Sequence, residues 1–145
     1  MTFPWAYLDS STFLKLYVKE KGSRNARSLV RRHRILSCSV LPIECLSALS
    51  RKRRAAEIGQ KDFKLLVQRI RTDYANLEAV QLGDEVLKKA EEVALQGVSG
   101  ALDFIHIGAA SIFQDETGID LLFFTSDKRQ FEAAIHFGLN AFYIG

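Results

Sequence analysis

The sequence predicts an α/β protein, a three-layer α/β/α sandwich built around a central parallel sheet. Short apolar runs typical of buried strands alternate with longer segments in which apolar residues recur at helical spacing. The run Leu121-Leu122-Phe123-Phe124 is continuously apolar, as interior strands of parallel sheets are. Because alternating strands and helices favour parallel strand pairing, we expect a ligand site beyond the carboxyl ends of the strands.

Each element follows from its local pattern. Strands are expected at residues 6–8, 35–38, 77–80, 121–124 and 141–144. Helices are expected at residues 13–19, 24–32, from Ser39 or Pro42 toward Ala56, beyond Gly59 from Phe63 to Tyr74, 84–95, 101–113 and 126–134. Ser10, Ser11 and Thr12 are suitable caps for the first of these helices. The helix at 101–113 is apolar almost all round, which is typical of a buried helix.

Length and composition predict one domain spanning residues 1–145. Cys38 and Cys45 stand in apolar surroundings and form no CxxC pair, so we expect two buried, reduced thiols. No apolar stretch approaches the roughly 20 residues of a membrane span. The first residues lack the basic region of a signal peptide. A cytoplasmic protein without a membrane segment is therefore the expectation.

Charge is distributed unevenly along the chain. Residues 1–72 hold 16 lysines and arginines against 5 acids, and the rest of the chain holds 4 against 12. Two basic clusters, Arg31-Arg32-His33-Arg34 and Arg51-Lys52-Arg53-Arg54, lie in the basic half. Such clusters are typical of phosphate binding, although a solvated helix face produces the same pattern.

Four acids occupy positions where a site is expected. Asp9 follows the first strand and Asp127 the fourth, while Glu44 and Asp103 lie in the first turns of otherwise apolar helices. Each acid alone is compatible with a helix cap or a favourable helix-dipole position. Together they supply the carboxylate oxygens that hard cations such as Mg²⁺ prefer.

Four segments of the chain resemble the acidic motifs of PIN-domain proteins, most closely those of VapC toxins from toxin–antitoxin pairs. The segments follow the family's order over the whole chain: Tyr7-Leu8-Asp9-Ser10-Ser11, Pro42-Ile43-Glu44, Ala101-Leu102-Asp103-Phe104-Ile105-His106 and Thr125-Ser126-Asp127. Phe104 and Gly108 depart from the smaller or more aliphatic residues usual there, which leaves the acids intact.

The resemblance implies a metal-dependent endoribonuclease that hydrolyses RNA phosphodiester bonds. It implies that Mg²⁺ or Mn²⁺ is held by four catalytic carboxylates, those of Asp9, Glu44, Asp103 and Asp127. Ser11 would contact a metal-bound water, and Thr125 would orient Asp127. We interpret His106 as a hydrogen-bonding, helix-packing residue rather than a metal ligand.

The resemblance also implies partners. The RNA backbone would contact the basic residues Arg51, Lys52, Arg53 and Arg54. A cognate antitoxin would insert a cationic side chain among the carboxylates. It would lie along a groove of this chain, whose apolar part is expected on the helices around Leu46 and Leu66. A homodimer is usual for the resembled family.

Three other interpretations make different demands on the sequence. A catalytically silent PIN-like RNA-binding module would keep the same fold. A receiver-type signalling domain would need a second acid beside Asp9 and a lysine after the last strand, and neither is present. A DNA-binding regulator would need a helix-turn-helix signature, which we do not find.

Overall fold

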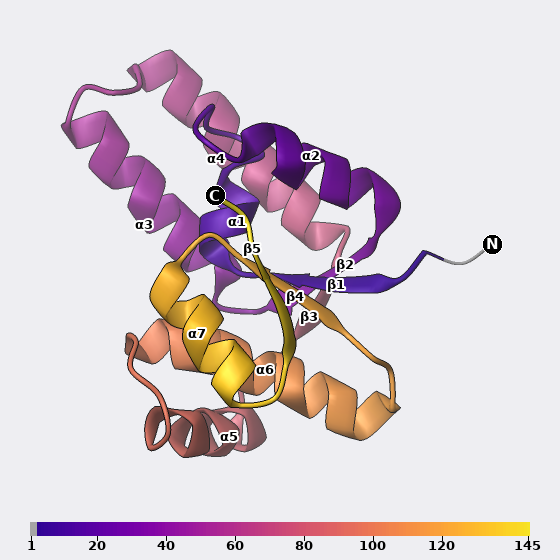
Figure 1. Cartoon of the computed structure of the whole chain (residues 1–145). Helices are drawn as coiled ribbons and strands as arrows, with labels where there is room; N and C mark the ends of the chain where they lie inside the picture. The colour runs from indigo at the N-terminus through magenta and orange to yellow at the C-terminus, as the bar shows by residue number, and fades with distance from the viewer. Residues whose placement is uncertain (1–2) are drawn as a thin grey trace.

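A computed structural model describes residues 3–145 of the chain (Figure 1). Within these residues five parallel strands form one sheet in the order β3-β2-β1-β4-β5. The strands are β1 (Trp5–Leu8), β2 (Arg34–Cys38), β3 (Glu78–Val80), β4 (Leu122–Thr125) and β5 (Asn140–Tyr143). The predicted α/β fold with a central parallel sheet is therefore confirmed.

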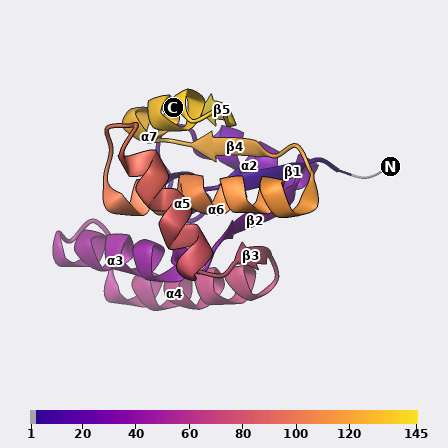
Figure 2. The ribbon, with the colours of Figure 1, turned by 90° about the horizontal axis from the view of Figure 1, so that it is seen from below.

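Seven helices are described in residues 3–145. They are α1 (Ser10–Leu14), α2 (Ser23–Arg32), α3 (Leu41–Arg54), α4 (Gln60–Ala75), α5 (Asp84–Ala94), α6 (Ala101–Thr117) and α7 (Lys128–His136). Figures 1 and 2 show α5, α6 and α7 on one side of the sheet, α2 on the other, and α3 and α4 as a projecting pair. These layers are the predicted three-layer sandwich.

Alternation along the strands divides the core between the two faces of the sheet. Tyr7 and Phe123 are buried against α5, α6 and α7, and their rings stack with centroids 5.3 Å apart. The next residues along each strand, Leu8 and Phe124, are buried against Leu29 of α2. Both faces of β1 and β4 are thus covered by apolar side chains, so the two strands lie at the centre of the molecule.

Helix α6 is the buried helix that its composition predicts. Phe104 and residues 106–111 are all buried. The helix continues four residues beyond the expected Phe113 and ends at Gly118, whose φ of 71° suits glycine. Gly108 lies where α6 crosses α5, and a Cβ atom there would come within 2.9 Å of the main-chain nitrogen of Ala90. The close crossing of these helices therefore depends on glycine at position 108.

The first helix differs from the expectation. It spans Ser10–Leu14 instead of residues 13–19, and Asp9 is its N-cap. The side chain of Asp9 accepts a hydrogen bond from the main-chain nitrogen of Thr12 at 3.0 Å. The prediction that Ser10, Ser11 or Thr12 caps this helix was wrong, because the aspartate at the strand end already fills that role.

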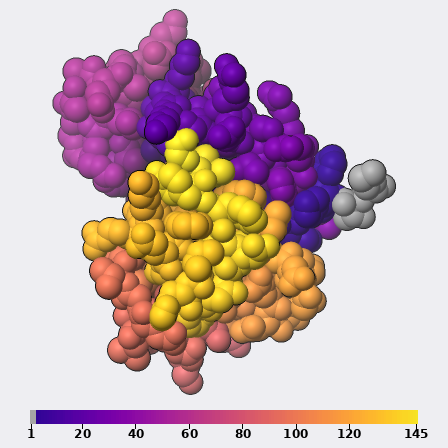
Figure 3. Space-filling view, viewed as in Figure 1, coloured from indigo at the N-terminus to yellow at the C-terminus, as the bar shows by residue number. Residues whose placement is uncertain are grey.

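Helices α1, α3 and α4 share a small core of their own. It consists of Phe13, Leu14, Leu41, Cys45, Leu49 and Ile70. Figure 3 shows a notch between the projecting α3–α4 pair and the C-terminal part of the chain. Cys38 and Cys45 are buried free thiols, as predicted. None of the helices in residues 3–145 is long and apolar enough to cross a membrane.

Candidate functional site

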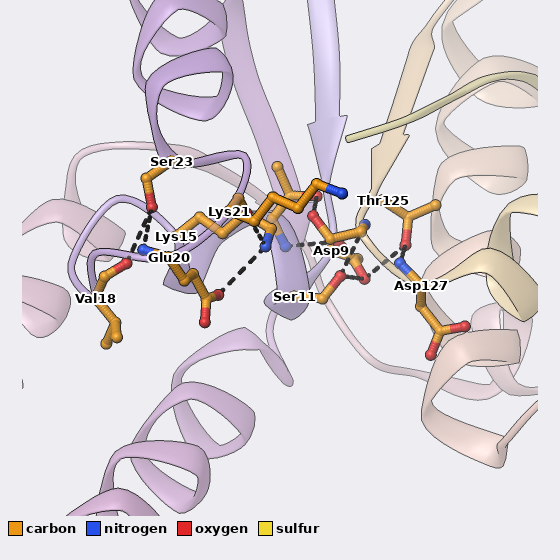
Figure 4. Close-up of polar contacts among 11 residues, drawn as sticks. Asp9, Ser11, Lys15, Val18, Glu20, Lys21, Ser23, Thr125 and Asp127 are labelled. Atoms are coloured by element: carbon orange, nitrogen blue, oxygen red, sulfur yellow. Dashed lines mark hydrogen bonds and ion pairs between the residues drawn. The ribbon is translucent and has the colours of Figure 1, made fainter. Parts of the chain in front are cut away.

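The site expected at the carboxyl ends of the strands is centred on β1 and β4. These strands pair so that Leu8 lies opposite Phe124, which brings Asp9 level with Thr125. The hydroxyl of Thr125 lies 3.0 Å from Oδ2 of Asp9. Figure 4 shows both side chains together with Ser11 and Asp127. Tertiary pairing of the two central strands therefore assembles parts of the first and last motifs.

Asp9 is a buried carboxylate that is satisfied by short-range donors. It is 2% exposed. Its Oδ2 accepts from the hydroxyl of Ser11 at 2.6 Å, and its Oδ1 accepts from the main-chain nitrogen of Thr12 at 3.0 Å. Among residues 3–145, no lysine or arginine pairs with it. Burial raises the pKa of Asp9 above its ordinary value of 3.8, and the hydrogen bonds that the carboxylate accepts lower it only in part.

Thr125 connects three parts of the site. Its Oγ1 lies near Oδ2 of Asp9 and 2.6 Å from Oε1 of Gln130, and it accepts from the main-chain nitrogen of Asp127 at 3.1 Å. One hydroxyl proton serves two acceptors here, so Asp9 and Gln130 compete for it. The contact of Thr125 with Asp127 is to the main chain, so the role of Thr125 in orienting Asp127 stays a prediction.

Asp127 is the N-cap of α7. Its Oδ1 accepts from the main-chain nitrogens of Arg129 at 2.9 Å and Gln130 at 3.1 Å. Asp103 has a similar local role at the start of α6, where its Oδ2 accepts from the hydroxyl of Ser99 and from the main-chain nitrogen of Gly100. Both carboxylates therefore stabilise the helix starts from which they project.

Glu44 is held by two side chains from other elements. Its Oε2 accepts from the hydroxyl of Ser10 at 3.1 Å, and its Oε1 lies 2.5 Å from Nε2 of His106. The other ring nitrogen of His106 lies 2.7 Å from the hydroxyl of Tyr7. Burial raises the pKa of Tyr7 well above its ordinary value, so its phenol keeps its proton at neutral pH. This contact pattern agrees with His106 as a hydrogen-bonding residue.

Hydrogen bonds connect the regions of all four acids. Ser126 donates its main-chain N–H to the hydroxyl of Ser11, which donates to Asp9. Gln130 donates from Nε2 to the main-chain oxygen of Asp103 at 3.2 Å. The carboxylates themselves stay apart: in residues 3–145 no three acidic, histidine or cysteine side chains form a group that could hold a metal ion.

The donor chemistry at this edge nevertheless suits a hard divalent cation. The acids supply oxygen ligands, and Asp9 is buried without a cationic partner among residues 3–145. Asp103 and Asp127 are engaged in helix capping, so their side chains would have to turn toward Asp9 to share an ion. Glu44 would keep its contact with His106 through one oxygen and offer the other.

A pocket of about 580 Å³ opens beside these acids. Helices α1 and α3 supply most of its lining, including Ser10, Ser11, Glu44, Arg51 and Lys52. Leu102, in the first turn of α6, and Ser126, directly after β4, complete the lining. The pocket therefore combines two carboxylates, several hydroxyls and three cationic side chains.

The four basic residues at the end of α3 do not have one common role. Arg51 and Lys52 line the pocket, and Arg51 donates to the hydroxyl of Ser47 at 3.0 Å. Arg53 instead stacks over the ring of Phe63 at 4.1 Å and lies near Gln60 of α4. Arg54 is exposed. Only the first two of the four are brought to the acidic edge.

Lys15 is a further cation on the pocket wall. It is 9% exposed, and its Nζ donates to the main-chain oxygen of Lys21 at 2.6 Å and lies 3.4 Å from Glu20 (Figure 4). These contacts fasten the turn between α1 and α2 beside the pocket. Sequence patterns did not predict this residue, because its position after a short helix resembles that of any surface lysine.

Several other residues of the site were missed as well. Tyr7, Ser10, Ser126 and Gln130 contact the acids or their partners. Gln130 is completely buried, although its neighbours Lys128 and Arg129 are exposed. A polar side chain on the inner face of a predicted helix is a signal that could have found Gln130. Tyr7 carried no such signal, since a tyrosine fits any buried strand.

Comparisons with known proteins relate most of the chain to one family. The model of the PIN domain family matches residues 6–135. No match was found among curated protein sequences. Among solved structures, a toxin-antitoxin complex from Klebsiella pneumoniae is similar, with a TM-score of 0.60 at 12% identity, over 87% of this chain and 89% of that chain. At this identity the structural likeness concerns the fold.

Proposed function

The chain belongs to the PIN-domain family, and from this premise we propose that it is a metal-dependent endoribonuclease and the toxin of a VapBC-type toxin–antitoxin pair. The observation that carries the proposal is the position of Asp9. It is a buried carboxylate at the carboxyl end of a central strand, with no cationic partner in residues 3–145 and a pKa raised by burial. A divalent cation would offset that charge.

Each acid has a role in this proposal. Asp9, Glu44, Asp103 and Asp127 would hold Mg²⁺ or Mn²⁺, which when bound would polarise the scissile phosphate and lower the pKa of a water. Ser11 and Thr125 hold Asp9 through its Oδ2 atom. The competition of Gln130 for the Thr125 proton leaves Asp9 able to exchange that hydrogen bond for a cation.

The lining of the pocket favours a phosphodiester substrate. Arg51 and Lys52 lie on its wall together with Glu44, so a phosphate could be bound by the cations while the scissile bond approaches the acids. We assign RNA binding to Arg51 and Lys52 first. Arg53 and Arg54 would contact the substrate only beyond the pocket, since Arg53 is stacked on Phe63.

An antitoxin partner is the second half of the proposal. The similar structure from Klebsiella pneumoniae is a toxin-antitoxin complex. Exposed apolar side chains beside the pocket, Ile43 at 66% and Leu102 at 47%, would offer the partner an apolar contact next to the carboxylates. This replaces the expectation for Leu46 and Leu66, which are only partly exposed.

A cleavage assay with end-labelled RNA tests the nuclease. We expect cleavage in Mg²⁺ or Mn²⁺, none in EDTA, and none by the Asp9→Asn variant. Asp120→Asn is the matched control, because Asp120 is exposed at the opposite, amino end of β4. Cleavage by Asp9→Asn at the rate of the unsubstituted protein would exclude the assignment.

The silent RNA-binding module remains the second candidate. It is favoured by the separation of the carboxylates, which form no metal-holding group in residues 3–145. The same assay separates the two functions: a silent module binds RNA equally with Mg²⁺ and with EDTA and leaves it intact.

A growth experiment tests the toxin role. We expect induced expression of the chain in bacteria to stop growth, and expression of Asp9→Asn to leave it normal. Co-expression with a small cognate antitoxin is expected to restore growth. Harmless expression of an active nuclease would count against the toxin while leaving the enzymatic assignment in place.

A further inference from the structure

Three buried polar side chains from three different elements form a chain of hydrogen bonds that ends at the pocket. Tyr7 of β1 is fully buried, and His106 of α6 is 1% exposed. The hydroxyl of Tyr7 lies 2.7 Å from Nδ1 of His106, and Nε2 of His106 lies 2.5 Å from Oε1 of Glu44. The side chain of Glu44 is 10% exposed and lines the pocket.

The donors and acceptors in this chain have a defined order. Burial raises the pKa of Tyr7, so the phenol keeps its proton, and we infer that it donates this proton to Nδ1 of His106, 2.7 Å away. Nδ1 is then without a proton, so a neutral imidazole carries its proton on Nε2 and donates it to Glu44. In residues 3–145 no buried side-chain nitrogen or oxygen is left without a hydrogen-bond partner. The histidine therefore presents a donor, and not a lone pair, to the carboxylate.

We propose that His106 is a positioning residue for the proposed nuclease: it holds one oxygen of Glu44, and Tyr7 selects the tautomer that allows this. The inference rests on the proposed function, because it concerns how Glu44 is presented there. Oε1 is engaged by His106, while Oε2 accepts a hydrogen bond from the hydroxyl of Ser10, a residue that lines the same pocket. The oxygen bound to the hydroxyl is the one available for exchange.

The arrangement resists rotation of the glutamate. Glu44 lies in the first turn of α3, and His106 lies on the buried helix α6, so the hydrogen bond joins two helices that are far apart in the sequence. The ring of Tyr7 is fixed by stacking on Phe123 and by an edge contact with His106 itself. A flexible side chain is thereby restricted by groups that are themselves buried and packed, which favours metal binding and catalysis.

Two substitutions at position 106 separate positioning from packing. In His106→Gln the amide nitrogen can take the place of Nε2 and donate to Glu44. In His106→Asn the shorter amide can take only the place of Nδ1, facing Tyr7. Both variants replace a buried ring by a smaller amide, so we expect similar losses in the free energy of unfolding, measured with urea.

Calorimetric titration of Mn²⁺ alone into the protein is the first readout. We expect His106→Gln to keep its Kd within a few-fold of the unsubstituted protein, and His106→Asn to weaken it by roughly 10- to 100-fold. RNA cleavage is the second readout, with a fall in kcat for His106→Asn and a KM that stays nearly constant. Equal losses in both variants would show a packing role only and overturn the proposal.

The tautomer is measured without any substitution, through the ¹⁵N chemical shifts of the His106 ring. A proton on Nε2 is the expected result, and a proton on Nδ1 alone would overturn the proposal. Tyr7→Phe keeps the stacked ring and removes only the hydroxyl. Without that hydroxyl both neutral tautomers of His106 become accessible, so Mn²⁺ binding should weaken as the fraction with a proton on Nε2 falls.

An unsubstituted protein that neither binds Mn²⁺ nor cleaves RNA would refute the proposed function, and this inference with it. Binding and cleavage that are insensitive to position 106 would refute only the inference.

Discussion

The hydroxyl of Thr125 lies 3.0 Å from Oδ2 of Asp9, although 116 positions of sequence separate the two residues. The contact exists because β1 and β4 are neighbours in the sheet, although they are the first and fourth strands of the chain. The main-chain nitrogen of Asp9 also donates to the oxygen of Phe124 at 3.4 Å. The pairing of two central strands therefore brings the first and last acidic motifs together.

Asp9→Asn is expected to abolish cleavage while preserving the fold. The amide keeps an acceptor for the main-chain nitrogen of Thr12, so the N-cap of α1 can persist. We expect cleavage to fall by more than about 100-fold, because even residues behind metal ligands contribute about 10- to 100-fold. Cleavage in Mg²⁺ is the measurement, with Asp120→Asn as the control.

The same variant has an expected effect on stability against pH. Burial makes the folded pKa of Asp9 higher than the unfolded value near 3.8, so the folded state binds the proton more tightly. Stability of the metal-free protein is therefore greatest, as far as Asp9 contributes, below that value and falls as pH rises through the folded pKa. Asparagine does not ionise, so the Asp9→Asn variant lacks this loss of stability with rising pH. Urea unfolding in EDTA at pH 4 and pH 7 should show a smaller decrease for Asp9→Asn; an identical decrease would contradict the assignment of this cost to Asp9.

Removing Arg51 and Lys52, two of the three cations that line the pocket, should weaken RNA binding and its dependence on salt. For Arg51→Ala with Lys52→Ala, the slope of log K against log salt should fall by roughly 1.4, about 0.7 for each lost contact to single-stranded RNA. The matched control is Arg31→Ala with Arg32→Ala, which removes the same charge from α2 at positions that do not line the pocket. Equal slopes in the two double variants would mean that general charge, and not the pocket, binds RNA.

Gly108→Ala should destabilise the crossing of α5 and α6. The added Cβ would lie 2.9 Å from the main-chain nitrogen of Ala90 and 3.1 Å from the main-chain oxygen of Val86, and neither backbone atom can move alone. Overpacking of this kind typically costs about 1–3 kcal/mol, more than the roughly 1 kcal/mol that alanine gains over glycine in a helix. Urea unfolding measures the loss. Gly83→Ala, which meets open space, is the control and should lose less than about 1 kcal/mol.

Both thiols should be unreactive in the folded protein. Burial raises the pKa of Cys45 to about 12 and also raises that of Cys38, so neither forms the nucleophilic thiolate at neutral pH. A coloured disulfide reagent is expected to label both cysteines in urea and neither on the same timescale without urea. Rapid labelling of the native protein would show that the core around α3 opens far more readily than its packing indicates.

Prediction from sequence succeeded where neighbouring residues decide the structure. Continuous apolar runs located the central strands, and the apolar composition of residues 101–113 identified the buried helix α6. It failed at α1, where Asp9 is both a strand-end acid and an N-cap, and the hydroxyls after it only looked like caps. Local patterns identify several residues that could cap the helix. The direction in which the chain leaves β1 decides which of them is the N-cap.

The sequence by itself determined the α/β alternation, the burial of both cysteines and the order of the four acidic motifs, because each depends on residues close together in the chain. Only the tertiary structure decided which side chains meet. It brought Thr125 to Asp9 and joined Tyr7, His106 and Glu44 from three elements. It also turned Arg53 toward Phe63 while Arg51 and Lys52 line the pocket. Hydrogen bonds act over about 3 Å, so they depend on strand order and helix crossing, which no local pattern of residues specifies.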